Sequence, residues 1–479
     1  MTPFSTRMIC RITFPERRRR WHGRSRLTGG GPRETPYAAL PAARVIAAMS
    51  VTRGHRPTLD ERGALGITGA VGPRSGGVPA RIAVVFGGPS PEHDVSILTG
   101  LQVLRTLNQV TNIGELHSFY WAKSGDWFEV ATSLEASAFL DAPSSGRRST
   151  TYVRGFEVAS KGDTSSALQG VPSGATPLRL VLGSSGGFFA QSTGRFGSKE
   201  QHVAVDAVVV CCHGGPGEDG SLQGVFDLIG LRYTGPSLAG ALIGMDKLAF
   251  SALAASAWMQ MLPRVLVADS VPAPSFPGPY IVKPRFGGSS IGIEVVADYA
   301  TALARLRANP HLKRGAVLEP YHPDLFDLQI GVRLWPDPQL SAIERPLRTQ
   351  VGGEILGYLD KYVGPEGMTT APRELPARIS PELEGELRRV ALEVAQLAGV
   401  RGVARIDFLS DGDALYVNEI NTIPGSLGRH LWIDPPLTFA KLLLDLIAEA
   451  TARPSISFSV AGADGAVLRG AGSISGKLG

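Results

Sequence analysis

One stretch near the C-terminal end, Arg405–Pro424, constrains the fold more than any other part of the chain. Its sequence, RIDFLSDGDALYVNEINTIP, predicts two short strands, Val403–Leu409 and Leu415–Ile420, joined by a Ser-Asp-Gly-Asp turn. Side chains alternate between the two faces of a strand, so Glu419 and Asn421 should point the same way. The stretch therefore predicts an antiparallel hairpin with one polar face.

The polar residues of this hairpin predict a metal-phosphate site. If Asp407 in the first strand lies opposite Glu419 and Asn421, two carboxylates and one amide oxygen converge. Such hard oxygen ligands suit Mg²⁺, which usually binds through one or two carboxylates and nucleotide phosphates. Arg405, two residues before Asp407, would lie on the same face and could stabilise an anionic transition state. A polar hairpin with a solvated face is the alternative interpretation.

Length and composition are those of a globular protein of two to four units. The chain has 479 residues, and 43% of them are hydrophobic. Its apolar runs are shorter than the about 18 residues needed to span a membrane, so we expect no membrane segment. The neighbouring Cys211 and Cys212 lie in an apolar run and indicate buried packing in a reducing compartment. We therefore expect a cytoplasmic protein.

Residues 1–80 differ in charge from the rest. They contain 14 arginines, no lysine and four acidic residues, a net charge of +10, so 81–479 carry −5 of the total of +5. The acidic body argues against a nucleic-acid groove. A nucleic-acid arm and a targeting peptide are open alternatives for 1–80, but the segment lacks the apolar core of a signal peptide. We expect a disordered extension, which an early start codon would explain, and a disordered tail at 451–479.

Residues 81–237 predict a doubly wound α/β domain. A strand at 81–86 is followed by a glycine turn and a helix at about 90–107, which is the opening of an α/β unit. A second buried strand at 204–211 also ends in a glycine-rich loop. In such sheets ligands bind beside the carboxyl ends of the strands. Between these elements, about 134–200 is rich in Ser and Gly and predicts an irregular surface insertion.

Two further units follow, at 238–314 and 315–450. For the first we predict a continuous helix through Met245-Asp246-Lys247, a strand at Tyr280–Pro284 and a helix at about 298–308. For the second we predict strands at 316–319 and 328–334, a long loop at 348–378, a helix at 381–398, the polar hairpin and a closing helix at 437–450.

A lysine at the end of the predicted strand Tyr280–Pro284 indicates an anion site. Lysine is almost never fully buried without a partner, so Lys283 should point at a negative charge. The following loop, Gly287–Gly292, offers backbone N–H groups and the hydroxyls of Ser289 and Ser290, and its glycines allow close approach to a phosphate. A simple β-turn is the alternative. The loop is not a Walker A motif, which ends in Gly-Lys-Ser/Thr.

Three other positions carry weaker signals. Spacing alone favours a surface position for Lys247, and a lone histidine such as His213 is usually conformational, although its loop continues with Gly-Glu-Asp-Gly. Asp360-Lys361-Tyr362 lies in the long loop at 348–378. Such loops are often lids, and a flexible surface excursion is the alternative.

Taken in order, these motifs resemble the ATP-grasp ligases and, within them, the D-alanine–D-alanine ligases. The resemblance covers Arg81 to Ala450. It implies an α/β fold, α+β in the ATP-grasp part, in which a doubly wound N-terminal domain precedes two ATP-grasp subdomains that sandwich ATP. The motifs are FGGPSPEHDVS (86–96), HGGPGEDGSLQG (213–224), YTGPS (233–237), MDK (245–247), IVKP (281–284), GSSIG (288–292), DKY (360–362), RIDF (405–408) and NEINTIPG (418–425).

The resemblance also implies roles for individual residues. ATP phosphates would be bound by Lys247, Lys283, Lys361, Ser289 and Ser290, the adenine by Glu319, and the ribose by Asp327, where the family usually has Glu. Two Mg²⁺ ions, or Mn²⁺, would be held by Asp407, Glu419 and Asn421. A hydrogen-bonded trio would link the first-substrate site to the lid through Glu92, Ser289 and Tyr362. Glu92 would receive the ammonium of the first amino acid, His213 would lie near its carboxylate, and Arg405 with the N–H of Gly425 would bind the oxyanion.

The implied reaction is the ATP-dependent joining of two amino acids. The γ-phosphate would convert the first carboxylate into an acyl phosphate, and an amine would attack it and expel phosphate. The lysines and metal ions would neutralise the transferred phosphoryl group, so catalysis is mainly positioning and electrostatics. Closure of the lid would keep water from the acyl phosphate.

The chain departs from the family pattern at the acceptor site. After Asn-Thr-Ile-Pro-Gly the family usually has a Ser-Leu pair for the second carboxylate, and here His430 and Leu431 take those places. Pro320 also follows Glu319, where a lysine is common. A histidine there could favour a hydroxy acid, a different amino acid or a peptide amine, so the acceptor stays open.

Four functional interpretations follow. The first is D-alanyl-D-alanine synthesis for peptidoglycan precursors, and the second is ligation of another amino-acid or peptide pair. The third is nucleotide binding without ligase turnover, against which the intact Arg405 and metal residues argue. Nucleic-acid binding by 1–80 would be additional to any of these. The resemblance implies small amino-acid substrates and a homodimer.

Overall fold

A computed structural model describes most of the chain beyond residue 80. The described residues are 81–111, 113–140, 170–183, 185–194, 197–347, 372–456 and 458–470. The predicted extension at 1–80, residues 141–169, the end of the tail and most of the loop at 348–378, with Lys361 and Tyr362, lie outside them. Among the described helices none is long and apolar enough to cross a membrane.

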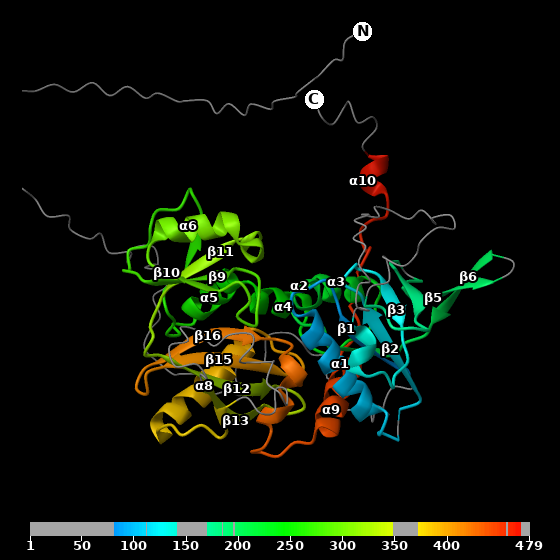
Figure 1. The fold of residues 1–479 in the computed structure, drawn as a ribbon. Coiled ribbons are helices and arrows are strands. Elements are labelled where there is room, and N and C mark those ends of the chain that lie inside the picture. The colour runs from blue at the N-terminus through cyan, green and yellow to red at the C-terminus, as the bar shows by residue number, and fades with distance from the viewer. Residues whose placement is uncertain are drawn as a thin grey trace, which may run out of the picture. The chain divides into compact units, whose positions relative to one another are not determined.

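The N-terminal sheet has seven strands in the order β6-β5-β4-β3-β2-β1-β7 (Figure 1). Strand β1, next to the edge strand β7, pairs in parallel with β2 and β7, and the other neighbours are antiparallel. The strands are β1 Arg81–Gly87, β2 Glu115–Trp121, β3 Trp127–Glu129, β4 Thr176–Val181, β5 Gly187–Gly194, β6 Gly197–Val203 and β7 Ala207–Val210. The helices in this part are α1 His93–Leu107, η2 Ala136–Phe139, α2 Gly215–Glu218 and α3 Ser221–Leu228.

The hydrophobic core around this sheet includes strands β1 and β7 and the helices that pack on them. Residues 82–86 of β1 and 207–210 of β7 are continuous apolar runs and are buried, as expected for parallel strands covered on both faces. Helix α1 lies close to β1, because a Cβ atom at Gly100 would overlap the ring of Phe86. The last long helix, α9 (Phe439–Ala452), adds Leu442, Leu443, Leu446 and Ile447 to the same core.

The prediction of an irregular insertion at about 134–200 is wrong for residues 176–203. These residues form β4, β5 and β6, which extend the sheet from β3. Leu178 and Phe188 are buried in the core. The Ser- and Gly-rich composition of the whole segment concealed these apolar anchors.

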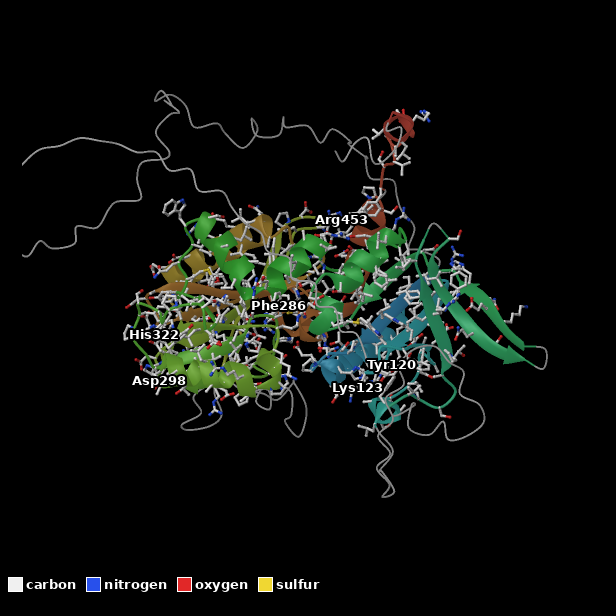
Figure 2. The ribbon with its side chains drawn as sticks, turned by 90° about the horizontal axis from the view of Figure 1, so that it is seen from above. Tyr120, Lys123, Phe286, Asp298, His322 and Arg453 are labelled. Carbon is white, nitrogen blue, oxygen red and sulfur yellow. The ribbon has the colours of Figure 1, made fainter. Side chains whose placement is uncertain are left out.

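The central part contains a four-stranded antiparallel sheet in the order β10-β9-β11-β8. Figure 2 shows the side chains from above and labels Tyr120 in β2 of the N-terminal sheet and His322, which follows the last strand of the central sheet in the chain. The strands of this central sheet are β8 Val265–Val267, β9 Tyr280–Pro284, β10 Glu294–Val296 and β11 Ala316–Pro320. Its helices are α4 Leu238–Met245, α5 Lys247–Ser256, α6 Tyr299–Ala308 and η3 Pro310–Leu312.

The prediction of one continuous helix through 245–247 is wrong. Asp246 has an extended ψ of 103°, ends α4 and caps α5 by accepting a hydrogen bond of 3.0 Å from the N–H of Leu248. Asp246 also accepts a 2.8 Å hydrogen bond from Arg285. The break at Asp246 makes Lys247 the first residue of α5.

The C-terminal sheet has five antiparallel strands in the order β14-β13-β12-β15-β16. Apolar residues of α8, four or three positions apart, pack on it: Leu383, Leu387, Ala391 and Val394. Strand β13 was not predicted. The elements are β12 Phe326–Arg333, β13 Gln339–Pro346, β14 Arg373–Glu374, α8 Pro381–Leu397, β15 Ala404–Ser410, β16 Leu415–Asn421, η5 Gly425–Leu431, α9 and α10 Ala466–Arg469.

Candidate nucleotide and metal site

A row of polar residues crosses the C-terminal sheet. The strand register pairs Glu344 of β13 with Gln329 of β12, Gln329 with Asp407 of β15, and Asp407 with Glu419 of β16. Directly paired residues share one face of a sheet. Three of the four, all but Glu344, line one pocket. The predicted hairpin and the position of Asp407 opposite Glu419 are confirmed.

A β-bulge adds a residue that alternation did not reveal. Asp407 pairs with Glu419 but Phe408 pairs with Val417, so Asn418 is the extra residue on β16. The bulge lets Asn418 line the pocket beside Glu419, and its Oδ1 accepts a hydrogen bond of 3.4 Å from Lys283.

Asp407 lies at the centre of a hydrogen-bonded group. Its two oxygens accept hydrogen bonds from Arg405 at 2.7 and 2.8 Å, and one also accepts from Asn421 at 3.1 Å and from Gln329 at 3.4 Å. Arg405 pairs with Asn421 across the hairpin. The structure thus brings together the three predicted metal ligands and the predicted oxyanion residue. Within the described residues no three His, Cys, Asp or Glu side chains are placed so that they could hold a metal ion by themselves, so a cation here would depend on amide and phosphate oxygens as well.

Both predicted ATP lysines reach the same pocket. Lys247 donates a hydrogen bond of 2.6 Å to the carbonyl of Gly287 and lies 3.5 Å from Glu419. Lys283 donates to Glu319 at 2.7 Å. Both lysines are buried, so the interpretation of Lys247 as a surface lysine is wrong. Burial lowers the pKa of Lys247, and the neighbouring Glu419 acts against this shift.

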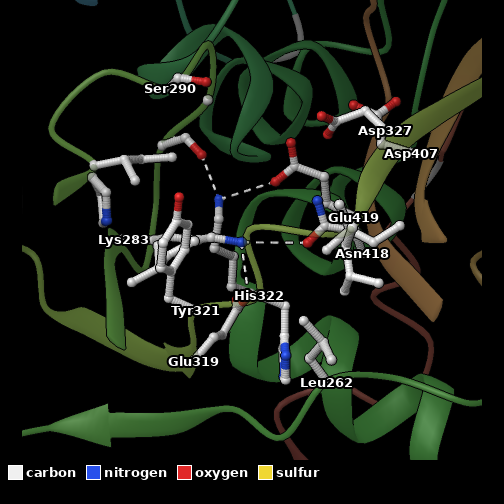
Figure 3. Close-up of a pocket in the computed structure, with 18 of the residues that line it drawn as sticks. Leu262, Lys283, Ser290, Glu319, Tyr321, His322, Asp327, Asp407, Asn418 and Glu419 are labelled. Atoms are coloured by element: carbon white, nitrogen blue, oxygen red, sulfur yellow. Dashed lines mark hydrogen bonds and ion pairs between the residues drawn. The ribbon is translucent and has the colours of Figure 1, made fainter. Parts of the chain in front are cut away.

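The pocket has differently lined sides (Figure 3). Figure 3 shows Leu262 and His322 together, and Asp327, Asp407 and Glu419 gathered on another side, with Ser290 on the loop above Lys283. Further apolar lining comes from Ile281, Ile293, Leu325 and Leu409. A planar base fits such apolar walls, and phosphates fit the lysines and the glycine loop.

Glu319 is held by two cations. Its oxygens accept hydrogen bonds from Arg264 at 2.6 Å and from Lys283 at 2.7 Å. Burial acts to raise the pKa of Glu319, but Arg264 and Lys283 outweigh it and lower the pKa to about 2. Arg264 lies in none of the sequence motifs, so its part in the site was not predicted.

The loop Gly287–Gly292 contacts the loop between β1 and α1, which carries Glu92. Ser289 donates a hydrogen bond to Glu92, and a Cβ atom at Gly288 would lie 3.2 Å from the same carboxylate. Ser289 and Ser290 have left-handed φ values of 52° and 58°, a conformation that costs free energy and is common at functional sites. Two members of the predicted trio therefore meet, and the third, Tyr362, lies outside the described residues.

Comparison with known proteins accounts for this arrangement. The models for the D-ala D-ala ligase N-terminus and C-terminus match residues 81–236 and 242–448. A D-alanine–D-alanine ligase of Mycolicibacterium smegmatis is 30% identical in an alignment of 397 positions that covers 78% of this chain and 96% of that protein. The chain belongs to the D-alanine–D-alanine ligase family.

Other relatives agree. A D-alanine–D-alanine ligase of Nocardia farcinica is 29% identical in an alignment of 392 positions that covers 78% of this chain and 97% of that protein. The solved D-alanine–D-alanine ligase of Helicobacter pylori has a TM-score of 0.55 at 20% identity and covers 79% of this chain and 99% of its own. The solved D-Ala:D-Ser ligase of Enterococcus faecalis has a TM-score of 0.55 at 21% sequence identity and covers 77% of this chain and 98% of its own. The predicted ATP-grasp fold and the prediction of an ATP-dependent ligase are confirmed.

In this family member the backbone at Ile423 is held by two buried side chains. His213 donates from Nδ1 to the carbonyl of Ile423 at 2.8 Å, and its Nε2 lies 2.7 Å from the hydroxyl of Thr99. Glu218 accepts from the N–H of Ile423 at 3.0 Å and from that of Gly214 at 2.9 Å. Both ring nitrogens of His213 therefore have protein partners, and contact with a substrate carboxylate stays a prediction.

Burial sets the protonation of these two residues. Burial lowers the pKa of His213 to about 4. The positive charge of Arg405 adds to this shift, and the hydrogen bond to Ile423 opposes it. Burial raises the pKa of Glu218 to about 8, helped by the charge of Glu92. A neutral imidazole with Nδ1–H and a predominantly protonated carboxyl therefore flank the loop that leads to Gly425.

The acceptor segment of this ligase-family chain carries its own polar group. His430 lies 3.0 Å from Glu344, and Arg373 lies 3.0 Å from the other oxygen of that carboxylate. Burial acts to raise the pKa of Glu344, but His430, Arg373 and Arg405 lower it. Leu431, a predicted substrate contact, has its side chain fully buried, so only its backbone can reach a ligand.

Proposed function

We propose that the chain joins two D-alanines with ATP through an acyl phosphate, to supply a peptidoglycan precursor in the cytoplasm. The observation that carries this proposal is the convergence of Lys247, Lys283, Asp407 and Glu419 on one pocket, next to the Glu92–Ser289 bond. In a chain of this family, that convergence combines the groups needed for phosphoryl transfer and for holding the first amino acid. The division into 81–237, 238–314 and 315–450 belongs to the same proposal, except that β11 (Ala316–Pro320) pairs with β8 and β9 and so belongs to the central sheet and not to 315–450.

ATP would lie between the central and C-terminal sheets. The base would contact the apolar lining near Glu319, and Asp327 would take the ribose. The phosphates would be held by Lys247, Lys283 and the loop with Ser289 and Ser290. In this proposal Lys361, from the predicted lid, would add a further positive charge. Positioning the γ-phosphate against a bound carboxylate accounts for most of the rate gain, because phosphoryl transfer needs little else from a protein.

The oxygen donors of Asp407, Glu419 and Asn421 fit divalent cations. We propose two Mg²⁺ ions, with Mn²⁺ as an alternative, because hard oxygen ligands and phosphates are what Mg²⁺ prefers. Such ions would neutralise phosphate charge and hold the triphosphate in line. Arg405, which already hydrogen-bonds Asp407, would be near enough to the metal residues to stabilise the developing oxyanion with the N–H of Gly425.

The first amino acid would bind beside Glu92. A carboxylate there attracts its ammonium, and Ser289, already bonded to Glu92, connects this carboxylate to the phosphate loop. His213 and Glu218 fix Ile423 and therefore the start of the segment that carries Gly425. A homodimer is proposed from the family resemblance.

A second candidate function is ligation to a different acceptor. The observation that favours it is the group of His430, Glu344 and Arg373, which puts a charged cluster where the family usually has a serine. Such a cluster could select another amino acid, a hydroxy acid or a peptide amine.

The test is phosphate release from ATP with a panel of D- and L-amino acids and D-lactate, with the products identified by mass spectrometry. Strict dependence on D-alanine and formation of D-alanyl-D-alanine are expected. Turnover only with another pair would replace the first candidate with the second. Nucleotide binding without turnover for any pair would contradict both.

A further inference from the structure

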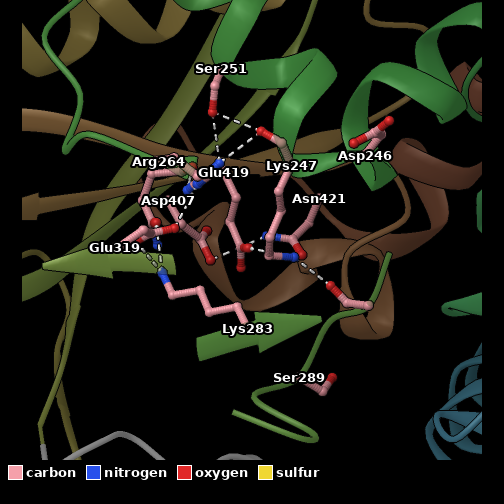
Figure 4. A network of polar contacts seen from close by, with 12 residues as sticks. Asp246, Lys247, Ser251, Arg264, Lys283, Ser289, Glu319, Asp407, Glu419 and Asn421 are labelled. Atoms are coloured by element: carbon pink, nitrogen blue, oxygen red, sulfur yellow. Dashed lines mark hydrogen bonds and ion pairs between the residues drawn. The ribbon is translucent and has the colours of Figure 1, made fainter. Parts of the chain in front are cut away.

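One buried arginine connects the parts of the nucleotide site. The guanidinium of Arg264, just before β8, donates to Glu319 of β11 at 2.6 Å and to the carbonyl of Asn418 in β16 at 3.2 Å. It also donates to the carbonyl of Lys247 at 3.0 Å and to the hydroxyl of Ser251 at 3.1 Å, both in α5. Figure 4 shows this network. Arg264 thus contacts three elements that carry pocket residues.

Arg264 has a position that excludes direct nucleotide contact. Its side chain is only 3% exposed, and Arg264 is absent from the pocket lining, whereas Glu319 and Lys283 are both part of it. Any effect of Arg264 on a ligand must therefore pass through the groups that it holds.

The charges of this cluster decide what Arg264 does. Lys283 and Glu319 alone would be a neutral pair, and an incoming phosphate would have to compete with Glu319 for the ammonium group. Arg264 adds a second cation on the other oxygen of the same carboxylate. Charge interactions are strong when the groups are removed from water, so the cluster of two cations and one anion keeps a net positive charge for the ligand.

We propose that Arg264 is a positioning residue of the nucleotide site: it occupies Glu319 as a counter-cation, which leaves the charge of Lys283 available to phosphate. The inference rests on the proposed binding of ATP in this pocket. It assigns to a residue outside all recognised motifs a share in phosphate affinity. The proposal distinguishes two effects of substituting Arg264. Loss of its charge should weaken the binding of ligands that carry phosphate, whereas a change in the shape of the pocket alone should weaken the binding of all ligands equally.

The experiment measures binding of a non-hydrolysable ATP analogue with Mg²⁺, and of adenosine, by calorimetry on the full chain. Arg264→Met should weaken binding of the ATP analogue about tenfold, the size expected for loss of one charge-assisted contact. Adenosine, which lacks phosphates, should lose much less. Arg264→Lys, which keeps the charge, should stay close to the unmodified chain.

A compensating variant sharpens the test. In the double variant Arg264→Met with Glu319→Gln, the anion disappears with the cation, so the affinity for the ATP analogue relative to that for adenosine should recover most of the tenfold loss, and adenosine reports any change in binding of the base. The matched control is the exposed pair of Arg389 and Glu393 on α8, where Arg389→Met should change nothing. If Arg264→Met does not fold, Arg264→Lys decides, and weak analogue binding by that variant would overturn the inference.

Two further outcomes are decisive. Unchanged analogue affinity in Arg264→Met, or equal losses for the single and double variants, would show that Arg264 has no electrostatic role and would overturn the inference. Absence of analogue binding to the unmodified chain would instead overturn the proposed function, because the ligand would not occupy this pocket.

Discussion

At the scale of single residues, the site depends on charges that are buried together. Lys247, Lys283, Asp407 and Glu319 are all at most 7% exposed, and each has a partner of opposite charge or a hydrogen-bond acceptor or donor. Removing one partner of a buried pair leaves an uncompensated charge and usually costs much more than the pair contributes. Each substitution at this site therefore needs a check of the fold beside the measurement of activity.

Lys283→Ala or Glu419→Ala should abolish ATP-dependent product formation while the fold persists. Each removes a group aimed at phosphate or metal, and loss of one such electrostatic contact typically lowers kcat by about a hundredfold or more. Phosphate release measures the loss, and circular dichroism checks the fold. Lys123→Ala, at a lysine whose side chain is 63% exposed, is the control and should keep full activity. Normal turnover in either site variant would remove the assignment.

Glu218 should make stability fall as pH rises. Its carboxyl keeps its proton up to about pH 8 in the folded chain and releases it near 4.5 when unfolded, so folding is favoured below 4.5 and this contribution is lost towards pH 8. His213, with its pKa lowered to about 4, acts in the opposite direction only below its unfolded value of 6.5.

Above pH 6.5 His213 no longer contributes a slope, and comparison with Glu218→Gln separates Glu218 from His117, whose pKa the hydrogen bond to Glu129 raises above 6.5. Between pH 6.5 and 8 the free energy of unfolding should fall by up to about 2 kcal/mol in the unmodified chain and stay flatter in Glu218→Gln. Urea unfolding at both pH values measures the difference. Equal slopes in the two proteins would show that Glu218 does not hold its proton in this range.

At the scale of helices and strands, close approach of the backbone is a separate requirement. Gly100 of α1 lies against Phe86, so Gly100→Ala should force an overlap and destabilise the fold by about 1–3 kcal/mol. At Gly385, on α8, an added Cβ atom would meet nothing within 4 Å. Gly385→Ala should therefore stabilise the fold by about 0.5–1 kcal/mol, since alanine favours a helix. Thermal unfolding of both variants measures the contrast, and shifts of the same sign would contradict it.

The same scale shows what the sequence could reveal. Strands β1 and β9 were predictable because short apolar runs end at glycine or turn residues, and β15 and β16 because they flank a Ser-Asp-Gly-Asp turn. Strands β4 to β6 were not, since their few buried side chains are spaced among Ser and Gly. The helix break at Asp246 depends on its capping bond and its pairing with Arg285, and the second of these is a tertiary contact.

Within the site, the sequence indicated residues that belong to motifs and missed those that act through contacts. Asp407, Glu419 and Lys283 were predictable because their residue types suit phosphate and metal. Asn418 needed the bulge, and Glu344 needed the pairing of β13 with β12. Arg264 needed the packing of α5, β11 and β16 around one guanidinium.

At the scale of the whole molecule, a helix late in the chain packs into the core of the N-terminal sheet. Helix α9 is next to the C-terminal sheet in sequence but shares a core with β1 and β7. Leu443→Ala should remove a fully buried side chain and destabilise the fold by about 2–5 kcal/mol. Amide hydrogen exchange should speed up in β7 and α1, far away in sequence. Leu397→Ala, at a leucine that is 43% exposed on α8, should have little effect, and exchange confined to α9 would contradict the shared core.

The position of α9 also affects how the chain is made. Phe439 is added to the nascent chain 229 residues after Val210 completes β7. Until then, the apolar surface that Leu442, Leu443, Leu446 and Ile447 later cover is open on the ribosome-bound protein. Exposed apolar surface of this kind attracts chaperones and promotes aggregation. Completion of the N-terminal sheet is therefore tied to synthesis of α9, and a product truncated before Phe439 would leave the ribosome with part of this core uncovered.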